Sequence, residues 1–245
     1  MSTLVELRDL CIQGPGRTLV EGVSFDIEPG KVTALVGPSG AGKSLTARAV
    51  MAVLDVVPGL TKGSLRYPAL DPSIDWFSGV AGGGARAQAA LLARTRHLRG
   101  AYLTYSPQAA SSALNPGRTI GRQLELAVAR RTQPPADMGA AVQTLLTEVG
   151  LDARAGASLP GELSGGMCQR AALAIAVAPQ PRLVIADEPE TGLDPVLRRI
   201  VVELLVTVCK DHGAGLLLIS HQEETVRRLA DAVIRLQGRT EEAQR

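Results

Sequence analysis

The chain has 245 residues, of which 45% are hydrophobic and 2% aromatic, and it carries 26 basic and 24 acidic side chains. A chain of this length and hydrophobicity can bury a large core, which argues against an intrinsically disordered protein. The net charge of only +2 and the scarcity of aromatic residues argue against broad electrostatic binding to nucleic acid and against a surface that stacks single-stranded bases.

The N-terminal part of the chain predicts strands followed by a helix. Residues 4–10 and 22–28 predict strands, the second because apolar and polar side chains alternate along it. Residues 32–36 form a nearly continuous apolar run, which is typical of a strand buried on both faces. A glycine-rich turn follows, and residues 43–54 predict a helix. Together they indicate the first half of a βαβ unit.

The middle of the chain has a different pattern. Residues 66–100 give the weakest signal: consecutive glycines precede an Ala- and Arg-rich segment that predicts a helix, and we expect a surface excursion there. Helices are predicted over residues 119–131 and 137–149, with Asp137 as the N-cap and Gly150 as the stop of the second. No strand is predicted around these helices, which indicates a helical insertion in an α/β core.

The C-terminal part returns to alternating strands and helices. Residues 183–186 and 216–219 predict buried strands, and residues 233–236 predict a weaker one. Asp194 is a candidate N-cap, with Pro195 in the first turn of the helix that follows. The sequence therefore predicts an α/β fold with a largely parallel central sheet.

A phosphate-binding pattern lies between the strand predicted at residues 32–36 and the next helix. GPSGAGKS matches GxxxxGK[ST], in which glycines let backbone N–H groups surround phosphate oxygens and the helix N-terminus adds its positive dipole end. We expect Lys43 to reach the β- and γ-phosphates of a nucleoside triphosphate and Ser44 to hold Mg²⁺. The predicted ATP-binding residues are Gly37, Pro38, Ser39, Gly40, Ala41, Gly42, Lys43, Ser44 and Leu45.

Two adjacent carboxylates follow the strand predicted at residues 183–186. Asp187 is placed to bind Mg²⁺, and Glu188 is the better candidate to polarise an attacking water molecule as a general base. A strand that simply ends in surface acids would have the same local sequence. The phosphate-binding pattern upstream favours the catalytic interpretation.

The segment LSGGMCQR provides a second candidate anion site. Ser164 is a favourable N-cap, and Gly165 and Gly166 leave backbone N–H groups accessible at the start of a helix. By itself, this pattern is equally that of an ordinary capped helix.

The segment LSGGMCQR lies between the phosphate-binding loop and the Ala-Asp-Glu that ends at Glu188. With these three motifs in this order, the chain resembles the ATP-binding subunits of ABC (ATP-binding cassette) transporters. The resemblance covers nearly the whole chain and implies a single ABC ATPase domain over residues 1–245. It implies a P-loop NTPase core of about 1–108 and 179–237, with an N-terminal antiparallel β part, and a helical subdomain of about 109–178.

The resemblance also implies roles for residues that local pattern alone leaves unassigned. Gln108 matches the Q-loop, implied to touch Mg²⁺ and to lie where a membrane partner binds, and His221 matches the switch histidine, implied to hold the γ-phosphate. Asp194 belongs to the matching D-loop. Two such subunits would pack head to tail, with each ATP between the Lys43 loop of one and the signature helix of the other. The signature residues implied to face the partner's ATP are Ser164, Gly165, Gly166 and Gln169.

Residues 108–116 resemble the peptide/opine/nickel importer group, because Asn-Pro follows Gln at the same offset. Within that group, the likeness is to nickel-import ATP-binding subunits of the D type and next to dipeptide and oligopeptide importer ATPases. The resemblance implies ATP and Mg²⁺ as cofactors and, as partners, a second and different ATPase subunit, two transmembrane permease subunits and an extracytoplasmic substrate-binding protein. It implies a peripheral position on the cytoplasmic face of the inner membrane and no nucleic acid. An exporter ATPase and a soluble ABC ATPase acting on nucleic acid or ribosomes share the core motifs.

Two positions depart from the pattern of the group. No aromatic residue precedes Phe25 to stack on adenine, so Ile12 or Gln13 is expected to cover the base. Glu190 stands where Thr is common after Asp-Glu-Pro. The first departure bears on nucleotide affinity and leaves the phosphate chemistry unchanged.

Overall fold

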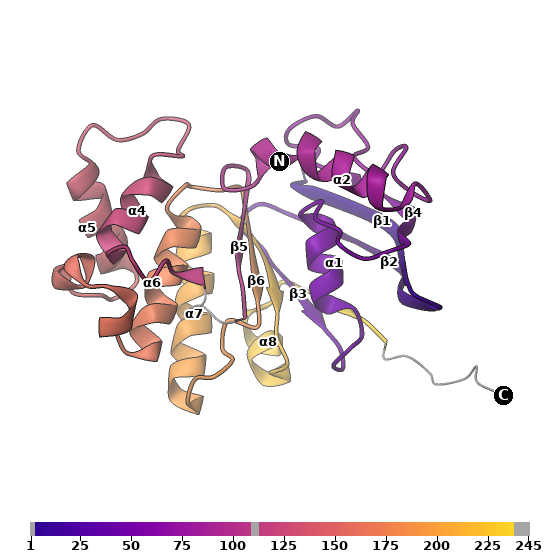
Figure 1. Cartoon of the computed structure of the whole chain (residues 1–245). Helices are drawn as coiled ribbons and strands as arrows, with labels where there is room; N and C mark the ends of the chain where they lie inside the picture. Colours follow the sequence, from indigo (N-terminus) through magenta and orange to yellow (C-terminus); the bar gives the residue numbers. More distant parts are fainter. Residues whose placement is uncertain (1–2, 109–112, 238–245) are drawn as a thin grey trace.

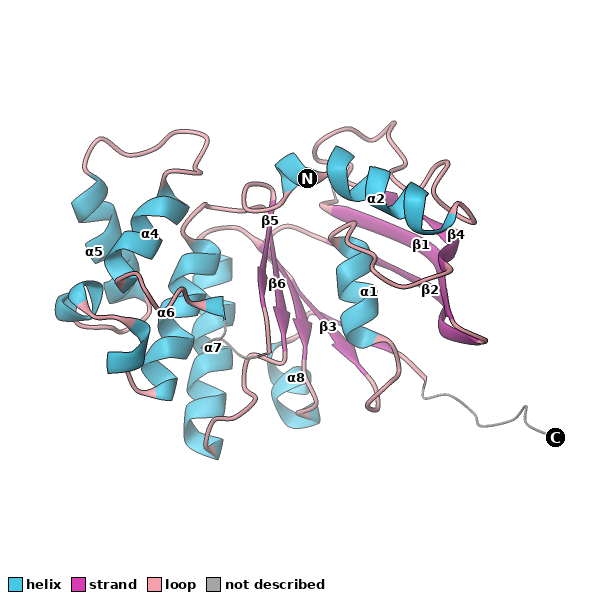
Figure 2. Ribbon diagram, viewed as in Figure 1, coloured by secondary structure: helices cyan, strands magenta, loops and turns pink. Residues whose placement is uncertain are grey.

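Two β-sheets form the framework of the protein in the computed structural model, which describes residues 3–108 and 113–237. One sheet is antiparallel and lies at one end of the molecule (Figure 2). Its strands, in spatial order, are β2 (Arg17–Ile27), β1 (Val5–Gly14) and β4 (Gly59–Arg66). The other sheet is parallel; its strands, in spatial order, are β5 (Leu103–Ser106), β6 (Leu183–Asp187), β7 (Gly215–Ile219), β3 (Val32–Val36) and β8 (Ala232–Arg235). The predicted α/β fold, largely parallel with an N-terminal antiparallel part, is confirmed.

Helices pack on both faces of the parallel sheet. Figure 1 shows α1 between the two sheets, while α4, α5 and α6 gather at the opposite end of the molecule beside α7. Within the described residues, none of the helices combines the length and apolar character needed to cross a membrane. The helices are α1 (Lys43–Val50), α2 (Gly84–Arg94), α4 (Ile120–Val128), α5 (Met138–Glu148), α6 (Gly165–Val177), α7 (Pro195–Asp211) and α8 (Glu223–Leu229), and the 3-10 helices are η1 (Arg96–Leu98), η2 (Ala153–Ala157) and η3 (Pro160–Glu162).

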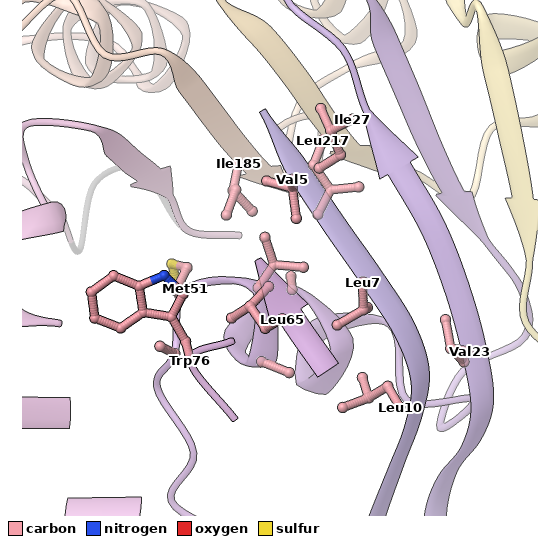
Figure 3. Close-up of a cluster of buried hydrophobic side chains, with 14 of the residues drawn as sticks. Val5, Leu7, Leu10, Val23, Ile27, Met51, Leu65, Trp76, Ile185 and Leu217 are labelled. Carbon is pink, nitrogen blue, oxygen red and sulfur yellow. The ribbon is translucent and has the colours of Figure 1, made fainter. Parts of the chain in front are cut away.

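The parallel sheet separates two hydrophobic cores. Leu217 and Ile185 point into the first core, where they meet the inner face of the antiparallel sheet, including Val5 and Leu65 (Figure 3). Their neighbours Leu216 and Val184 point into the second core, built with α4, α5, α6 and α7. Because alternate residues of β6 and β7 are buried on opposite faces, these strands are continuous apolar runs, which is why the sequence predicts them well.

Helix-capping residues position the helices of the second core. Asp137 accepts a hydrogen bond from the Ala140 N–H at 2.8 Å, and Gly150 takes a left-handed φ of 67° after α5 ends. Thr119 caps α4 in the same way. The two helices predicted in this region are therefore confirmed, whereas the start expected for the helical part at about residue 109 lies outside the described residues.

Helix α1 ends earlier than predicted. The sequence predicts a helix to residue 54, but the last helical residue is Val50. Ala52 has a φ of 55°, its N–H bonds to the Ala49 carbonyl, and the Val53 N–H bonds to the Arg48 carbonyl. This is a Schellman motif, which usually has glycine at the left-handed position. Because alanine occupies this position, the sequence lacks the glycine that would have predicted the end of the helix.

The segment that follows β4 is not the surface excursion expected from the sequence. Tyr67, Trp76 and Phe77 are buried in the first core, and Tyr67 donates a hydrogen bond to the Val50 carbonyl at 2.6 Å. The expectation was wrong because these large side chains are spaced irregularly between turns. Neither a helical nor a strand period marks them as buried.

Candidate functional site

The loop between β3 and α1 curls around an open pocket. Gly42 has a φ of 90°, and a Cβ there would lie 2.8 Å from the Leu19 carbonyl oxygen. At Gly37 a Cβ would lie 2.6 Å from the Leu236 carbonyl oxygen. The loop therefore depends on glycine at both positions. The pocket has a volume of about 260 Å³ and is lined by Leu19, Ser39, Gly40, Gly42, Lys43, Ser44, Leu45, Glu188 and His221.

Lys43 is buried at the base of this loop. Its Nζ donates hydrogen bonds to the Gly37 and Pro38 carbonyl oxygens, each at 2.9 Å. The N-cap position of α1, Gly42, has no side chain to cap the helix, so the N–H groups of the first turn are available to an anion. A cation, a helix N-terminus and a glycine-rich loop thus converge on the same pocket and fit the phosphates of a nucleotide.

Ser44 and Asp187 meet on the other side of the loop. The Ser44 Oγ donates to Asp187 Oδ1 at 3.2 Å, and the Tyr105 hydroxyl donates to Asp187 Oδ2 at 3.0 Å. Burial, and then the Asp187 carboxylate, raises the pKa of Tyr105 to about 12, so its hydroxyl remains a donor. A hydroxyl and a carboxylate are the oxygen ligands that Mg²⁺ accepts, with water and phosphate completing its shell. The residues present therefore fit a magnesium ion.

Glu188 lies at the centre of a second cluster. Its carboxylate forms an ion pair with His221 through Oε1 and accepts a hydrogen bond from Gln108 Nε2 at 2.8 Å through Oε2. The Thr191 hydroxyl also donates to Oε2, at 3.4 Å. The backbone of Glu188 has a φ of 49°, uncommon outside glycine, and its N–H bonds to the Ile219 carbonyl at 2.9 Å.

The sheet topology explains why these side chains meet. Gln108, Glu188 and His221 follow β5, β6 and β7, which are neighbours in the parallel sheet. The carboxyl ends of parallel strands lie at one edge, where ligands bind in α/β folds. The structure thus brings together the three residues predicted as catalytic. Gln108 bonds to Glu188 here, and its expected contact with Mg²⁺ stays a prediction.

The second candidate anion site lies apart from this pocket. Ser164 caps α6 by accepting from the Met167 N–H at 3.3 Å, and Ser164 and Gly165 are exposed. Gly166 is buried against Leu197, and Gln169 is buried and donates to the Pro189 carbonyl at 2.6 Å. Helices α1 and α6 pack on opposite faces of the parallel sheet (Figure 1). One chain therefore carries two separate helix N-termini suited to an anion.

Asp194, which was predicted to belong to a D-loop, has a local structural role in this chain. Its Oδ1 accepts from the backbone N–H groups of Val196 and Leu197, each at 3.0 Å, and so caps α7. Asp194 itself is exposed. It lies outside the lining of the pocket beside Lys43.

The apolar wall of the pocket differs from the expectation. Ile12 is 0% exposed and points into the first core, so it does not cover an adenine; Gln13 is exposed. Two leucines line the pocket: Leu45, which was predicted, and Leu19, near the start of β2. Leu19 and Tyr105 were not predicted from the sequence. Neither residue belongs to a motif, so only the fold reveals their proximity to the site.

Comparisons with known proteins agree with this geometry. A family model described as ABC transporter matches residues 20–191. The peptidoglycan transport ATP-binding protein YejF of Agrobacterium fabrum is 35% identical over 238 residues, which cover 94% of this chain and 41% of that protein. The oligopeptide transport ATP-binding protein OppD of Mycobacterium tuberculosis is 34% identical over 252 residues, which cover 99% of this chain and 39% of that protein. The chain thus spans about two fifths of the length of these relatives.

The fold of this chain is also similar to that of a solved structure. That structure is described as the ATP-binding subunit of an ABC transporter and superposes with a TM-score of 0.71 at 27% identity. The superposition covers 95% of this chain and 85% of that one.

Proposed function

The chain belongs to the ABC transporter family, and from that premise we propose that it hydrolyses ATP to drive the uptake of peptides through membrane partners. The observation that carries the proposal is the cluster of Gln108, Glu188 and His221 beside the Lys43 loop. A candidate base, its two polar partners and a phosphate cradle are the parts that ATP hydrolysis requires.

Nucleotide binding follows from the loop. The Lys43 ammonium exchanges its two carbonyl acceptors for phosphate oxygens, since hydrogen bonds between charged partners are stronger than those to neutral carbonyls. Ser44 and Asp187 would hold Mg²⁺, which would offset the negative charge of the nucleotide phosphates. Leu19 supplies apolar surface at the mouth of the pocket.

Hydrolysis follows from Glu188. Both of its carboxylate oxygens already have partners, His221 on one and Gln108 on the other. To accept a proton from water, Glu188 must release one of them. His221 is the partner that moves, because its side chain is 43% exposed and lines the pocket where a γ-phosphate would lie. Binding of the γ-phosphate thereby draws His221 away and frees the base.

The exposed N-terminus of α6 supports a two-cassette arrangement. Ser164 and Gly165 are accessible and lie on the opposite face of the sheet from α1, so they suit an ATP held by a partner subunit rather than by this chain. We assign residues of about 1–108 and 179–237 to the nucleotide-binding core and about 109–178 to the helical subdomain. The partner is a second, different cassette.

The transport role places the chain on the cytoplasmic face of the inner membrane, with two permease subunits and an external binding protein. The names of the relatives, which are peptidoglycan and oligopeptide transport ATP-binding proteins, favour a peptide cargo. Nickel or metal chelates are the second cargo class, supported by the resemblance of residues 108–116, of which 109–112 lie outside the described residues.

Gentle purification of the tagged chain from native membranes tests this proposal. We expect two permeases, a second cassette and the external binding protein to be recovered with it. Recovery of the chain alone from the aqueous fraction, or with ribosomes or nucleic acid, would overturn the transporter role and leave the ATPase chemistry standing. Recovery with a permease but without any companion binding protein would favour export.

The cargo is tested on the purified complex reconstituted in vesicles. Binding protein loaded with an oligopeptide, or with a nickel chelate, is added and ATP turnover is measured. A rise with peptide alone supports the peptide assignment. A rise with the nickel chelate alone replaces it with the metal class.

A further inference from the structure

A buried carboxyl group that the proposed mechanism does not use lies next to the catalytic cluster. Glu190 follows Glu188 by two residues and is only 5% exposed. Burial raises the pKa of its carboxyl above the ordinary value. Its Oε2 is buried and has no hydrogen-bond partner among the described residues. A buried polar atom without a partner costs stability, so packing alone gives no reason for a carboxyl here.

The other oxygen of Glu190 holds the turn that carries His221. Glu190 Oε1 accepts a hydrogen bond from Ser220 Oγ at 2.5 Å, and Ser220 Oγ in turn accepts from the Gln222 N–H at 3.1 Å. The Ser220 hydroxyl therefore bridges the residues on both sides of His221. Because Ser220 is buried at the end of β7, its hydroxyl has a fixed position from which to hold this turn.

Glu190 is itself fixed by its own backbone and neighbours. The Thr191 N–H bonds to the Glu188 carbonyl at 3.1 Å, and the Leu193 N–H bonds to the Glu190 carbonyl at 3.3 Å. On the other side, Gln169 of α6 donates to the Pro189 carbonyl at 2.6 Å. The segment that carries Glu188 and Glu190 is thus hydrogen-bonded to α6, and Glu190 connects this segment to the turn that carries His221.

We propose that Glu190 is a positioning residue: by accepting the Ser220 hydroxyl, it holds the turn that directs His221 onto Glu188. The inference rests on the proposed function of Glu188 and His221 in hydrolysis. Two contacts would then join the segment after β6 to the segment after β7, the Glu190–Ser220 hydrogen bond and the Glu188–His221 ion pair. Loss of the first should loosen the second.

Histidine NMR tests the positioning directly and without turnover. The full chain has three histidines, so selective ¹³C labelling gives three ring signals, of which His221→Ala identifies one. Glu190→Ala and Ser220→Ala should each shift the His221 signal. Glu190→Gln keeps a carbonyl acceptor for Ser220 and should restore it. His212, which contacts Glu148 elsewhere, is the internal control.

One NMR result would contradict the positioning role of Glu190. An unmoved His221 signal in both alanine variants, while each keeps a folded spectrum, would overturn the inference. If Glu190→Ala does not fold, Ser220→Ala decides alone, because it removes only the hydroxyl.

A double-mutant cycle on ATP turnover gives the second test, using the full chain with its co-purified partners. Glu190→Ala should lower kcat about tenfold, within the range for a displaced catalytic group, and leave KM within about twofold. Its effect should vanish in the His221→Ala background, measured as residual phosphate release. An equal fold-loss in both backgrounds would reduce Glu190 to a general structural role and overturn the inference. Absence of turnover in the wild-type complex would instead overturn the proposed function, and the NMR test of Glu190 would still stand.

Discussion

Replacing Glu188 with glutamine removes the proposed base with little change in shape. The amide oxygen of the variant can still accept from Gln108 Nε2, which lies 2.8 Å from Oε2 in the native protein. The amide nitrogen cannot take a proton from water. A lost general base typically costs about 10²–10⁴ in rate, so we expect kcat to fall by at least about 10², which corresponds to about 2.7 kcal/mol of transition-state stabilisation.

Nucleotide binding should survive this change. Lys43, Ser44 and Asp187 make their contacts without Glu188, through the Gly37 and Pro38 carbonyls and through the Ser44–Asp187 hydrogen bond. The variant should therefore bind ATP with an affinity within about threefold of wild type, since the groups expected to hold the phosphates are unchanged. Phosphate release measures kcat, and titration with a fluorescent ATP analogue measures affinity.

Glu125→Gln is the matched control. Glu125 lies on α4, is half-buried with its side chain 40% exposed, and pairs with Arg122 at 2.7 Å. A solvent-accessible pair of this kind contributes at most about 1 kcal/mol to stability, so the control should keep wild-type turnover. If Glu188→Gln keeps turnover within about tenfold of the control, below the range for a lost base, the assignment of Glu188 as the base is refuted.

Further predictions concern the loop, the core and the tyrosines. Lys43→Ala removes the lysine ammonium group from the pocket lining, so ATP affinity should fall at least about tenfold in the same titration. Gly42→Ala places a Cβ 2.7 Å from Val20 Cγ2 at a φ of 90° and should lower the free energy of unfolding by about 1–3 kcal/mol, measured by urea denaturation. Leu146→Ala, a fully buried position of α5, should cost about 2–5 kcal/mol in the same assay. Burial raises the pKa of Tyr102 and Tyr105 to about 12, so their phenolate absorbance should be absent at pH 10 in the folded protein. The free energy of unfolding should fall as the pH rises from about 10 towards 12, because only the unfolded chain then loses these protons.

The glycine-rich loop after β3 and the strands beside it could be predicted from the sequence for a physical reason. β3, β6 and β7 are buried on both faces, and burial on both faces forces continuous apolar runs that stand out in a sequence. The loop after β3 needs glycine where side chains would collide with other backbone, so its spacing is distinctive as well. Strands and loops that can form only with a restricted set of residue types are therefore the elements that the sequence predicts.

Other parts of the site depend on positions with no required residue type. Leu19 lines the pocket only because β2 passes beside the loop, and Tyr105 reaches Asp187 only because β5 pairs with β6. Ile12 failed as the expected cover for adenine because the pairing of β1 with β2 and β4 turns it into the core. Sheet register decides all three, and a one-residue change of register would reverse which side chains face the pocket.

The arrangement around Glu188 gives a reason why a single cassette should be a poor enzyme. Its carboxylate is held by Gln108 and His221, both from the same chain, so a water molecule competes with groups that are already in place. The second candidate anion site, at Ser164, belongs to α6, which packs on the opposite face of the parallel sheet from α1. A γ-phosphate fixed between the Lys43 loop and a partner's Ser164 helix would attract His221 and vacate one oxygen of Glu188. We infer that closure of two cassettes and release of the base are the same event, because the group that senses the phosphate is the group that blocks the base.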